Sequence, residues 1–177
     1  MGGVAILTAP DQQTTQIATL GYIPEGVAGT RATLAQMASW VRLYRVEPQI
    51  RAFAEQIIAN VPSKDEYAEI NAIFEWVRDN VRYTQDVRDV EMLKSPDALI
   101  SERFGDCDDM STLVSTLLET VGYTTRLVAV GYTQPGVYEH VYAEVILNGA
   151  WVSLETTEPV SLGFFQPNER ARMEVPV

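Results

Sequence analysis

The sequence predicts an α+β domain, because segments with helical periodicity come first and segments with a period of two follow them. Apolar residues recur at spacings of three and four up to residue 121, whereas residues 124–157 alternate and are rich in Val, Tyr, Leu and Thr. The pair Asn148-Gly149 between two of these alternating segments is a strong hairpin signal. The 177 residues suit a single domain with a substantial core.

Several helices are predicted in the first two thirds of the chain. Pro48 and Pro96 stand where a helix can begin without losing a hydrogen bond. Ser63 and Glu66 form a Ser-x-x-Glu pattern, which predicts a capping box at Ser63. The expected helices run from about residue 31 to 46, from Pro48 to about residue 60, from Ser63 to Val81 with Tyr67, Ile70, Phe74 and Val77 on one face, from Ser95 to Gly105 and from Cys107 to Val121, before Gly122.

The remaining segments are three strands and two ends with weak periodicity. Scattered Gly, Pro, Thr and Gln in residues 1–30 predict an extended arm, and the prolines after Glu158 predict that the segment from Val160 onward lies along the surface. Strands are expected at 124–133, 139–147 and 150–157. The predicted organisation is an arm at 1–30, one domain at 31–160 and a tail at 161–177.

The hairpin turn allows a geometric test of which side chains meet. If Asn148-Gly149 is a two-residue turn, Leu147 faces Ala150 and the residues of both strands that share a face are fixed. His140 and Glu155 then become diagonal neighbours, with backbones ~7–8 Å apart. The register therefore predicts that the single histidine of the chain lies beside a carboxylate.

Cys107, the single cysteine, is predicted at the start of a helix, where backbone N–H groups favour a thiolate. Asp106, Asp108 and Asp109 oppose this effect, because negative charge raises the pKa of a thiol. Acyl transfer needs a nucleophile, a base and a group that orients the base. Cys107, His140 and Glu155 can fill these roles if the helix start packs against the hairpin.

Each of the three residues also has a plain structural interpretation. A lone cysteine is usually a small buried apolar residue, and a lone histidine on a strand is usually a satisfied structural group. An acidic residue opposite Tyr142 is usually one half of a solvated pair. The order of helix-start Cys, strand His and next-strand acid favours the chemical interpretation of all three together.

Five segments resemble the transglutaminase-like superfamily of papain-like cysteine peptidases. Gly105-Asp106-Cys107-Asp108-Asp109 is similar to the nucleophile segment, and Glu139-His140-Val141-Tyr142-Ala143-Glu144-Val145 after Thr125-Arg126-Leu127-Val128 is similar to the Arg strand and His-Ala-Trp-Val-Glu strand. Trp151-Val152-Ser153-Leu154-Glu155-Thr156-Thr157 resembles the Trp-x-x-x-Asp-x-Thr strand, and Phe74-Glu75-Trp76-Val77 through Tyr83 resembles the helix and Tyr before the nucleophile. The strong resemblance covers residues 64–160. Residues 26–60 are similar to the N-terminal helices of small proteins of this type from tailed bacteriophages.

The resemblance implies a papain-like core in which the nucleophile helix packs on an antiparallel sheet, with extra N-terminal helices. It implies Cys107, His140 and Glu155 as the catalytic triad. Glu155 departs from the usual Asp, and Tyr142 from the usual Trp.

An oxyanion hole needs donors aimed at the developing charge. The first would be the Cys107 N–H. Tyr83 or Gln85, ahead of the nucleophile, could supply the second, although a core aromatic is an equal interpretation of Tyr83. The acidic loop with Asp106 and Asp108 could select basic residues of a substrate.

Composition excludes several classes of function. The net charge of -11 and the lack of a Lys/Arg cluster disfavour nucleic-acid binding. No apolar run approaches the ~20 residues of a membrane span. One histidine and one cysteine make neither a zinc site nor a metal triad, the EF-hand spacing is absent, and no phosphate loop is present, so neither metal nor cofactor is expected.

The predicted function is thiol-dependent amide chemistry through a thioester, with hydrolysis of a peptide or amide bond preferred over transfer to an amine. The alternative is a non-catalytic structural or assembly component of a phage particle, which would bind other phage proteins through residues 1–30 and 161–177. The lone cysteine and the lack of a basic leader favour a cytoplasmic location in the bacterial host, or the virion for the alternative.

Overall fold

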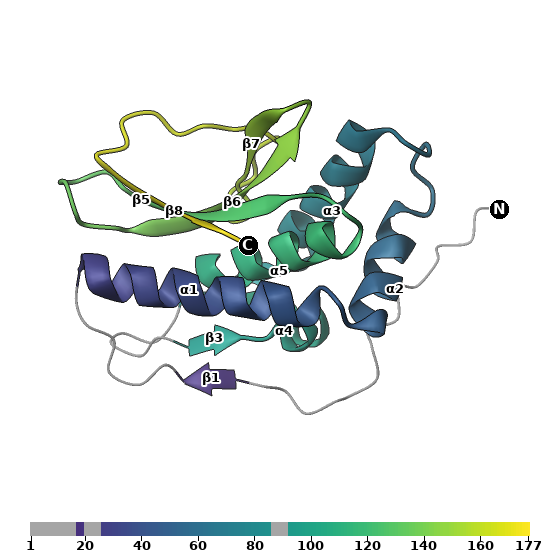
Figure 1. The fold of residues 1–177 in the computed structure, drawn as a ribbon, viewed down its shortest axis with the longest axis horizontal. Helices are drawn as coiled ribbons and strands as arrows, with labels where there is room; N and C mark the ends of the chain where they lie inside the picture. Colours follow the sequence, from purple (N-terminus) through teal and green to yellow (C-terminus); the bar gives the residue numbers. More distant parts are fainter. Residues whose placement is uncertain (1–16, 20–25, 86–91) are drawn as a thin grey trace.

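The part of the chain that the structure describes forms an α+β domain of five helices and a four-stranded antiparallel sheet, with the helices gathered on one side of the sheet (Figure 1). The structure is a computed structural model that describes residues 17–19, 26–85 and 92–177. The helices are α1 (Val27–Tyr44), α2 (Pro48–Ile58), α3 (Glu66–Asn80), α4 (Pro96–Glu102) and α5 (Cys107–Thr120). The predicted fold class is confirmed.

The main sheet has the strand order β7-β6-β5-β8, and each pair of neighbouring strands in it is antiparallel. Its strands are β5 (Thr125–Gly131), β6 (His140–Leu147), β7 (Ala150–Leu154) and β8 (Ala171–Pro176). Two small pairings lie outside this sheet: β1 (Ile17–Thr19) with β3 (Met92–Lys94), and β2 (Arg82–Tyr83) in parallel with β4 (Phe104–Gly105). The second pairing fixes the chain just before α5.

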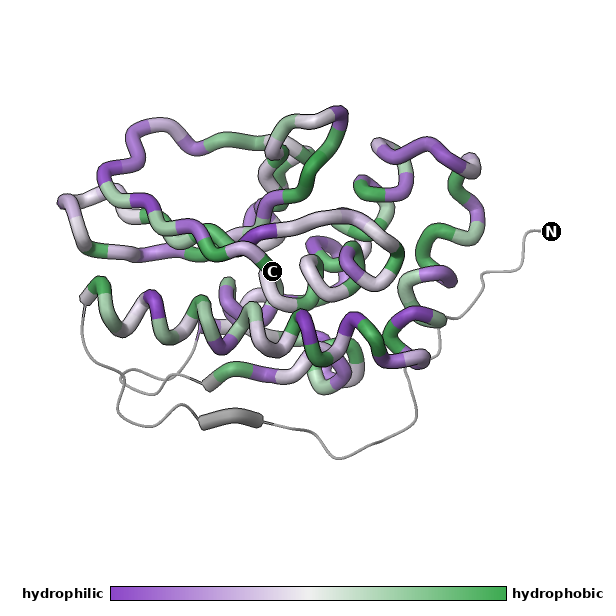
Figure 2. The backbone as a smooth tube through the Cα atoms, viewed as in Figure 1, coloured by the Kyte–Doolittle hydropathy of each residue, from purple (hydrophilic) through white to green (hydrophobic). Residues whose placement is uncertain are grey.

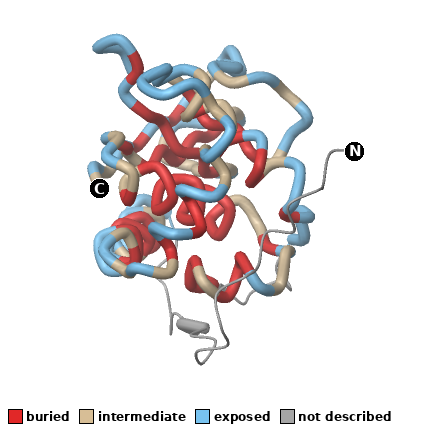
Figure 3. Tube along the Cα trace, turned by 90° about the vertical axis from the view of Figure 1, so that its right-hand side faces the viewer, coloured by how far each residue is buried: buried red, intermediate tan, exposed pale blue. Residues whose placement is uncertain are grey.

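Helix α5 is the centre of the fold. It contacts α1, α3, α4 and β6, and nearly all its residues are buried (Figure 3). Its buried hydroxyl groups find acceptors: Ser111 Oγ donates to the Val141 carbonyl at 3.2 Å, and Thr112 and Thr116 donate to carbonyls four residues earlier at 2.7 Å. The first turn of α5 is therefore held rigidly against the start of β6.

The other helices cover α5 through one apolar face each. Helix α1 mixes hydrophilic and hydrophobic residues along its length (Figure 2), and it turns Leu34, Met37 and Val41 into the core. Together, α1 and α5 cover the face of the sheet that carries Leu127 and Ala143. The opposite, outer face carries a separate small apolar cluster of Val128, Val130 and Tyr142.

The hairpin register predicted from Asn148-Gly149 is confirmed. Leu147 pairs with Ala150 and Ala143 with Leu154, and both turn residues have positive φ, 53° for Asn148 and 78° for Gly149. An Asn-Gly turn supplies this conformation at little steric cost, which is why two residues suffice to set the register of the hairpin.

Four predictions about element ends are wrong. Helix α1 begins at Val27 rather than near residue 31. The cap of α3 is Asp65, whose carboxylate accepts from the Ala68 N–H at 3.1 Å, so Ser63 and Glu66 form no capping box and Tyr67 lies on the exposed side. Helix α4 ends before Arg103, which has a left-handed conformation. The strand expected at 150–157 ends at Leu154.

The prediction that the segment after Val160 lies along the surface is wrong for its last part. Residues Ala171–Pro176 form β8, which pairs along the whole of β5 and buries Ala171 and Met173. Apolar and polar residues alternate through 171–175, which is a strand signal, whereas the prediction rested on the nearby prolines alone. Most of the predicted arm at 1–30 lies outside the described residues, and its residues 27–30 belong to α1.

Candidate active site

A cavity of about 300 Å³ lies where the first turns of α1 and α5 meet the start of β6. Both Cys107 and His140 line this cavity. The remaining lining comes from Gly26, Gly29, Thr30, Thr33 and Leu34 of the α1 region, from Asp106 and Asp108 beside the cysteine, and from Tyr138, Glu139 and Val141. Gly29, Thr30 and Thr33 of α1 have small side chains, which leave room for the cavity beside the Cys107 thiol.

His140 and Glu155 are in direct contact. His140 Nε2 lies 2.6 Å from Glu155 Oε2, which confirms the neighbour relation predicted from the hairpin register. The second oxygen, Oε1, accepts from the Thr157 backbone N–H at 2.9 Å and from its hydroxyl at 2.7 Å. Burial pushes the pKa of Glu155 upward, but the hydrogen bonds and charge of His140 and the bonds from Thr157 outweigh burial and lower it. The carboxylate is therefore ionised and fixed in place.

This contact determines which nitrogen of the imidazole can act. With Nε2 facing a carboxylate, the neutral ring carries its proton on Nε2 and leaves Nδ1 as the acceptor. Nδ1 has no hydrogen-bond partner among the described residues. His140 shares the outer face of β6 with Tyr142 and Glu144. Because His140 is the first residue of the strand, its ring nevertheless stands at the end of the sheet and borders the cavity.

Cys107 is the first residue of α5, and a capping box fixes the turn around it. The Asp106 carboxylate accepts from the N–H groups of Asp108 and Asp109 at 3.1 and 3.2 Å, while the Asp109 carboxylate accepts from the Asp106 N–H. Gly105 makes this possible, because a Cβ there would lie 2.7 Å from Asp109 Oδ2. This cap does not use the Cys107 N–H.

The environment of the thiol favours its protonated form. Burial raises the pKa of Cys107 well above its usual value, and the charges of Asp108 and Asp106 raise it further. The thiol donates to Asp108 Oδ1 at 3.4 Å, and the opposing backbone N–H of Val141 is too weak to reverse the shift. No hydrogen bond joins the thiol to His140 within the described ranges. Burial, reinforced by the two aspartates, thus keeps the thiol protonated.

Asp109 is buried beneath this turn and serves the structure. Its Oδ1 accepts from the Lys94 N–H at 2.7 Å, which ties β3 to the start of α5. Burial, with a smaller contribution from Asp106, raises the pKa of Asp109 to about 7. The carboxyl group therefore changes its protonation state near neutral pH.

The other predicted site residues lie farther from the thiol. Tyr83 pairs with Gly105 across β2 and β4, but its side chain lines a second cavity, of about 190 Å³, together with Met110 and Thr157. Gln85 is exposed, and neither residue lines the Cys107 cavity. Tyr142 lies on the outer face with its ring stacked near His140, at a centroid distance of 6.3 Å. The structure does not bring these three side chains to the thiol.

The sequence did not single out the partners that surround the histidine. Thr157, whose hydroxyl donates to Glu155, receives no role from the sequence pattern, and Arg172 and Glu169, which bind the Tyr142 hydroxyl, lie in the predicted tail. In the part of the chain that the structure describes, no cluster of three His, Cys, Asp or Glu side chains could hold a metal ion. Over the same residues, no helix is long and apolar enough to cross a membrane.

A cysteine at the start of a central helix, packed on an antiparallel sheet that supplies a histidine and an acid, defines the papain-like class of folds. The chain matches the transglutaminase-like superfamily over residues 51–156, and it belongs to that superfamily. The match includes Cys107, His140 and Glu155.

Solved structures support the same fold. A cysteine protease candidate from Cytophaga hutchinsonii aligns with 75% of this chain and 46% of its own length, at 19% identity and a TM-score of 0.53. A protease candidate from Parabacteroides distasonis aligns with 78% of this chain and 31% of its own, at 15% identity and a TM-score of 0.53. LapG of Legionella pneumophila aligns with 81% of this chain and 79% of its own, at 17% identity and a TM-score of 0.53.

The chain spans less than half the length of the first two of these proteins. No curated protein matches it in sequence.

Proposed function

We propose that this chain catalyses amide chemistry through a thioester on Cys107, with His140 as base and Glu155 as the group that orients the base. The observation that carries the proposal is the His140–Glu155 contact of 2.6 Å on a ring that borders the Cys107 cavity. A buried, ionised carboxylate at Nε2 stabilises the imidazolium that forms when Nδ1 accepts a proton.

The reaction begins from a protonated thiol. His140 Nδ1 takes the proton of the Cys107 thiol as Sγ attacks the acyl carbon, and a bond forms between sulfur and carbon. The imidazolium then gives the proton to the leaving nitrogen as the bond between carbon and nitrogen breaks. Water, activated by the same ring, attacks the thioester and releases the acid, and the thiol regains its proton.

The oxyanion of the intermediate would form near the start of α5. The Cys107 N–H, which the Asp106 cap does not use, is the donor that fits this position. Tyr83 and Gln85 remain proposals for the second donor, and both would need to turn toward the cavity. Hydrolysis is preferred over transfer to an amine.

An aryl ester tests the proposal without knowledge of the natural substrate. Incubation with p-nitrophenyl acetate should release a burst of nitrophenol equal to the enzyme concentration, then a slower steady release. Intact-mass analysis should show one acetyl group on the chain, which Cys107→Ala abolishes. Release of nitrophenol without an acetylated Cys107 would contradict the proposal.

One observation favours a second candidate, a non-catalytic structural or assembly role such as that of a phage particle component. The thiol has a raised pKa and makes its described hydrogen bonds with Asp108 and Val141 rather than with the imidazole. A degenerate site would behave in this way. The same ester assay separates the two candidates, because a structural protein shows neither the burst nor the acetylated cysteine.

A further inference from the structure

The ring of His140 is held on two sides by residues of different elements. Its Nε2 edge meets Glu155, which follows β7. Its face lies beside the Tyr142 ring, 6.3 Å away between centroids and inclined by 28°. Tyr142 is 6% exposed and lies two residues after His140, on the same face of β6. Any rotation of the Tyr142 ring would therefore change the space in which the imidazole stands.

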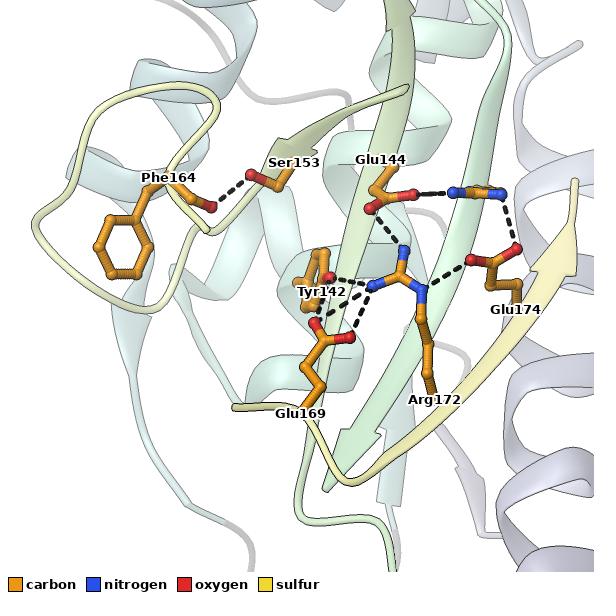
Figure 4. A network of polar contacts seen from close by, with 8 residues as sticks. Tyr142, Glu144, Ser153, Phe164, Glu169, Arg172 and Glu174 are labelled. Carbon is orange, nitrogen blue, oxygen red and sulfur yellow. Dashed lines mark hydrogen bonds and ion pairs between the residues drawn. The ribbon is translucent and has the colours of Figure 1, made fainter. Parts of the chain in front are cut away.

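The Tyr142 ring is itself fixed through its hydroxyl group. The hydroxyl accepts from Arg172 Nη1 at 2.7 Å and donates to Glu169 Oε1 at 3.1 Å. Figure 4 shows both partners gathered at the tip of the tyrosine. Tyr142, Glu155 and Glu169 also line one small pocket on this face of the sheet. The polar end of Tyr142 is thus anchored to the C-terminal segment.

Arg172 is placed by β8 and fixed by three carboxylates. It donates to Glu174 and Glu144 at 2.7 Å each and to Glu169 at 3.1 Å, in addition to its bond to Tyr142 (Figure 4). A planar guanidinium with five N–H donors can satisfy all these acceptors at once, which a lysine cannot. Most of the network therefore serves to hold one guanidinium in one orientation.

The segment that leads to β8 is attached at both ends. The Gly163 N–H donates to the Ser153 carbonyl at 3.0 Å, and Ser153 Oγ donates to the Phe164 carbonyl. At the far end, the Arg170 N–H donates to the Gly131 carbonyl at 2.8 Å. These contacts bring Glu169 and Arg172 to the outer face as ordered parts of the domain.

We infer that Arg172 is a positioning residue for the reaction: through the Tyr142 hydroxyl it holds the His140 ring where Nε2 meets Glu155 and Nδ1 borders the Cys107 cavity. The C-terminal strand thereby completes the active site from the far side of the sheet. The expected effect on the acetylation rate rests on the proposed function. The expected effect on the position of the His140 ring does not depend on it.

Arg126 offers a matched control. It also donates to Glu144 and Glu174, at 2.6 Å each, and its side chain is similarly buried, but it makes no bond to Tyr142. Arg126→Met therefore removes a cation and its ion pairs with Glu144 and Glu174, and Arg172→Met removes a cation, the same two kinds of ion pair and a third with Glu169. Only Arg172→Met removes the bond to the tyrosine.

The experiment measures two quantities in Arg172→Met, Arg126→Met and Tyr142→Phe. The first is the NMR signal of the His140 Nε2–H, which is protected from solvent exchange while it is bonded to Glu155; as the only histidine of the chain, it needs no assignment. The second is the rate of Cys107 acetylation by p-nitrophenyl acetate. Arg172→Met and Tyr142→Phe should each lose the protected signal and slow acetylation by roughly tenfold or more, whereas Arg126→Met should keep both.

The double variant Arg172→Met/Tyr142→Phe sharpens the test, because residues that act along one path have effects that do not add. We expect it to be no slower than the slower single variant. If Arg172→Met does not fold, the comparison of Tyr142→Phe with the control Arg126→Met decides the question. Tyr142→Phe removes only one oxygen atom from the outer face.

The inference is overturned if Arg126→Met matches Arg172→Met or Tyr142→Phe in both readouts. If the wild type shows no acetylation at all, the proposed function fails. The ring signal then still decides whether Arg172 positions His140.

Discussion

The histidine side and the cysteine side of the site stand in opposite electrostatic environments. On the histidine side, Glu155 is buried, bonded by His140 and Thr157, and its pKa is lowered. On the cysteine side, burial, Asp108 and Asp106 raise the pKa of the Cys107 thiol. The fold thus prepares the base and its orienting carboxylate but leaves the nucleophile protonated. Under the proposed function, the difference means that proton transfer from sulfur to the ring belongs to the reaction rather than to the resting state.

The strongest test of this comparison removes the nucleophile. Cys107→Ala should abolish acetylation and turnover completely. Because the cysteine is only partly buried at the edge of the core, the free energy of unfolding should fall by less than about 1 kcal/mol. Ester turnover and chemical denaturation check the two expectations. A variant that is clearly destabilised and still turns over substrate would make the thiol a structural residue.

The two buried carboxyl groups should have opposite effects on stability as pH changes. The pKa of Asp109 is raised from 3.8 to about 7, so its contribution to stability is complete below about pH 4 and is lost as pH rises through about 7. Asp109→Asn should therefore gain stability relative to wild type between pH 4 and 8, by at most about 4 kcal/mol.

For Glu155 the lowered pKa reverses the sign. Its contribution is present above its ordinary value of 4.5 and is lost as pH falls below that value. Denaturation series of wild type, Asp109→Asn and Glu155→Gln that run from about pH 8 to well below pH 4.5 measure both effects. Parallel pH profiles for all three proteins would contradict the opposed environments.

Substitution of Glu155 tests the histidine side alone. Glu155→Gln keeps an oxygen for the Nε2–H but removes the charge that stabilises the imidazolium, so acetylation of Cys107 should slow by roughly tenfold. Glu155→Ala also frees the ring to rotate, and we expect a loss of roughly a hundredfold. Rates that equal wild type in both variants would show that the His140–Glu155 contact has no part in the chemistry.

Alkylation tests the cysteine side alone, because iodoacetamide reacts with the thiolate only. Since the pKa of Cys107 is raised, alkylation of the folded protein at pH 7 should be roughly tenfold slower or more than that of the unfolded chain. Mass spectrometry of timed samples with and without denaturant measures the ratio. Faster alkylation in the folded protein would mean that a thiolate is already present.

The sequence predicted the parts of the site that depend on local rules. Asn148-Gly149 set the hairpin register, and the register alone placed His140 beside Glu155. The helix that begins at Cys107 followed from its apolar spacing. In each case, a short-range conformational preference determines which side chains meet.

The remaining features depend on contacts between distant segments, which local patterns do not encode. The pKa of Cys107 reflects how deeply α5 is packed, and burial is its largest cause. The position of Arg172 depends on the pairing of β8 with β5, in which Arg172 lies opposite Val130, 42 residues earlier in the sequence. Tyr83 lies in the parallel pairing of β2 with β4, and its side chain lines the second cavity.

The central claim, that His140 removes the proton of Cys107 during the reaction, has one direct test. The rate of Cys107 acetylation by p-nitrophenyl acetate at pH 7 is compared between wild type and His140→Gln. Because the resting thiol is protonated, we predict that wild type reacts roughly a hundredfold faster, in line with the usual contribution of a general base. Equal rates in the two proteins would contradict the claim, whatever the absolute rate.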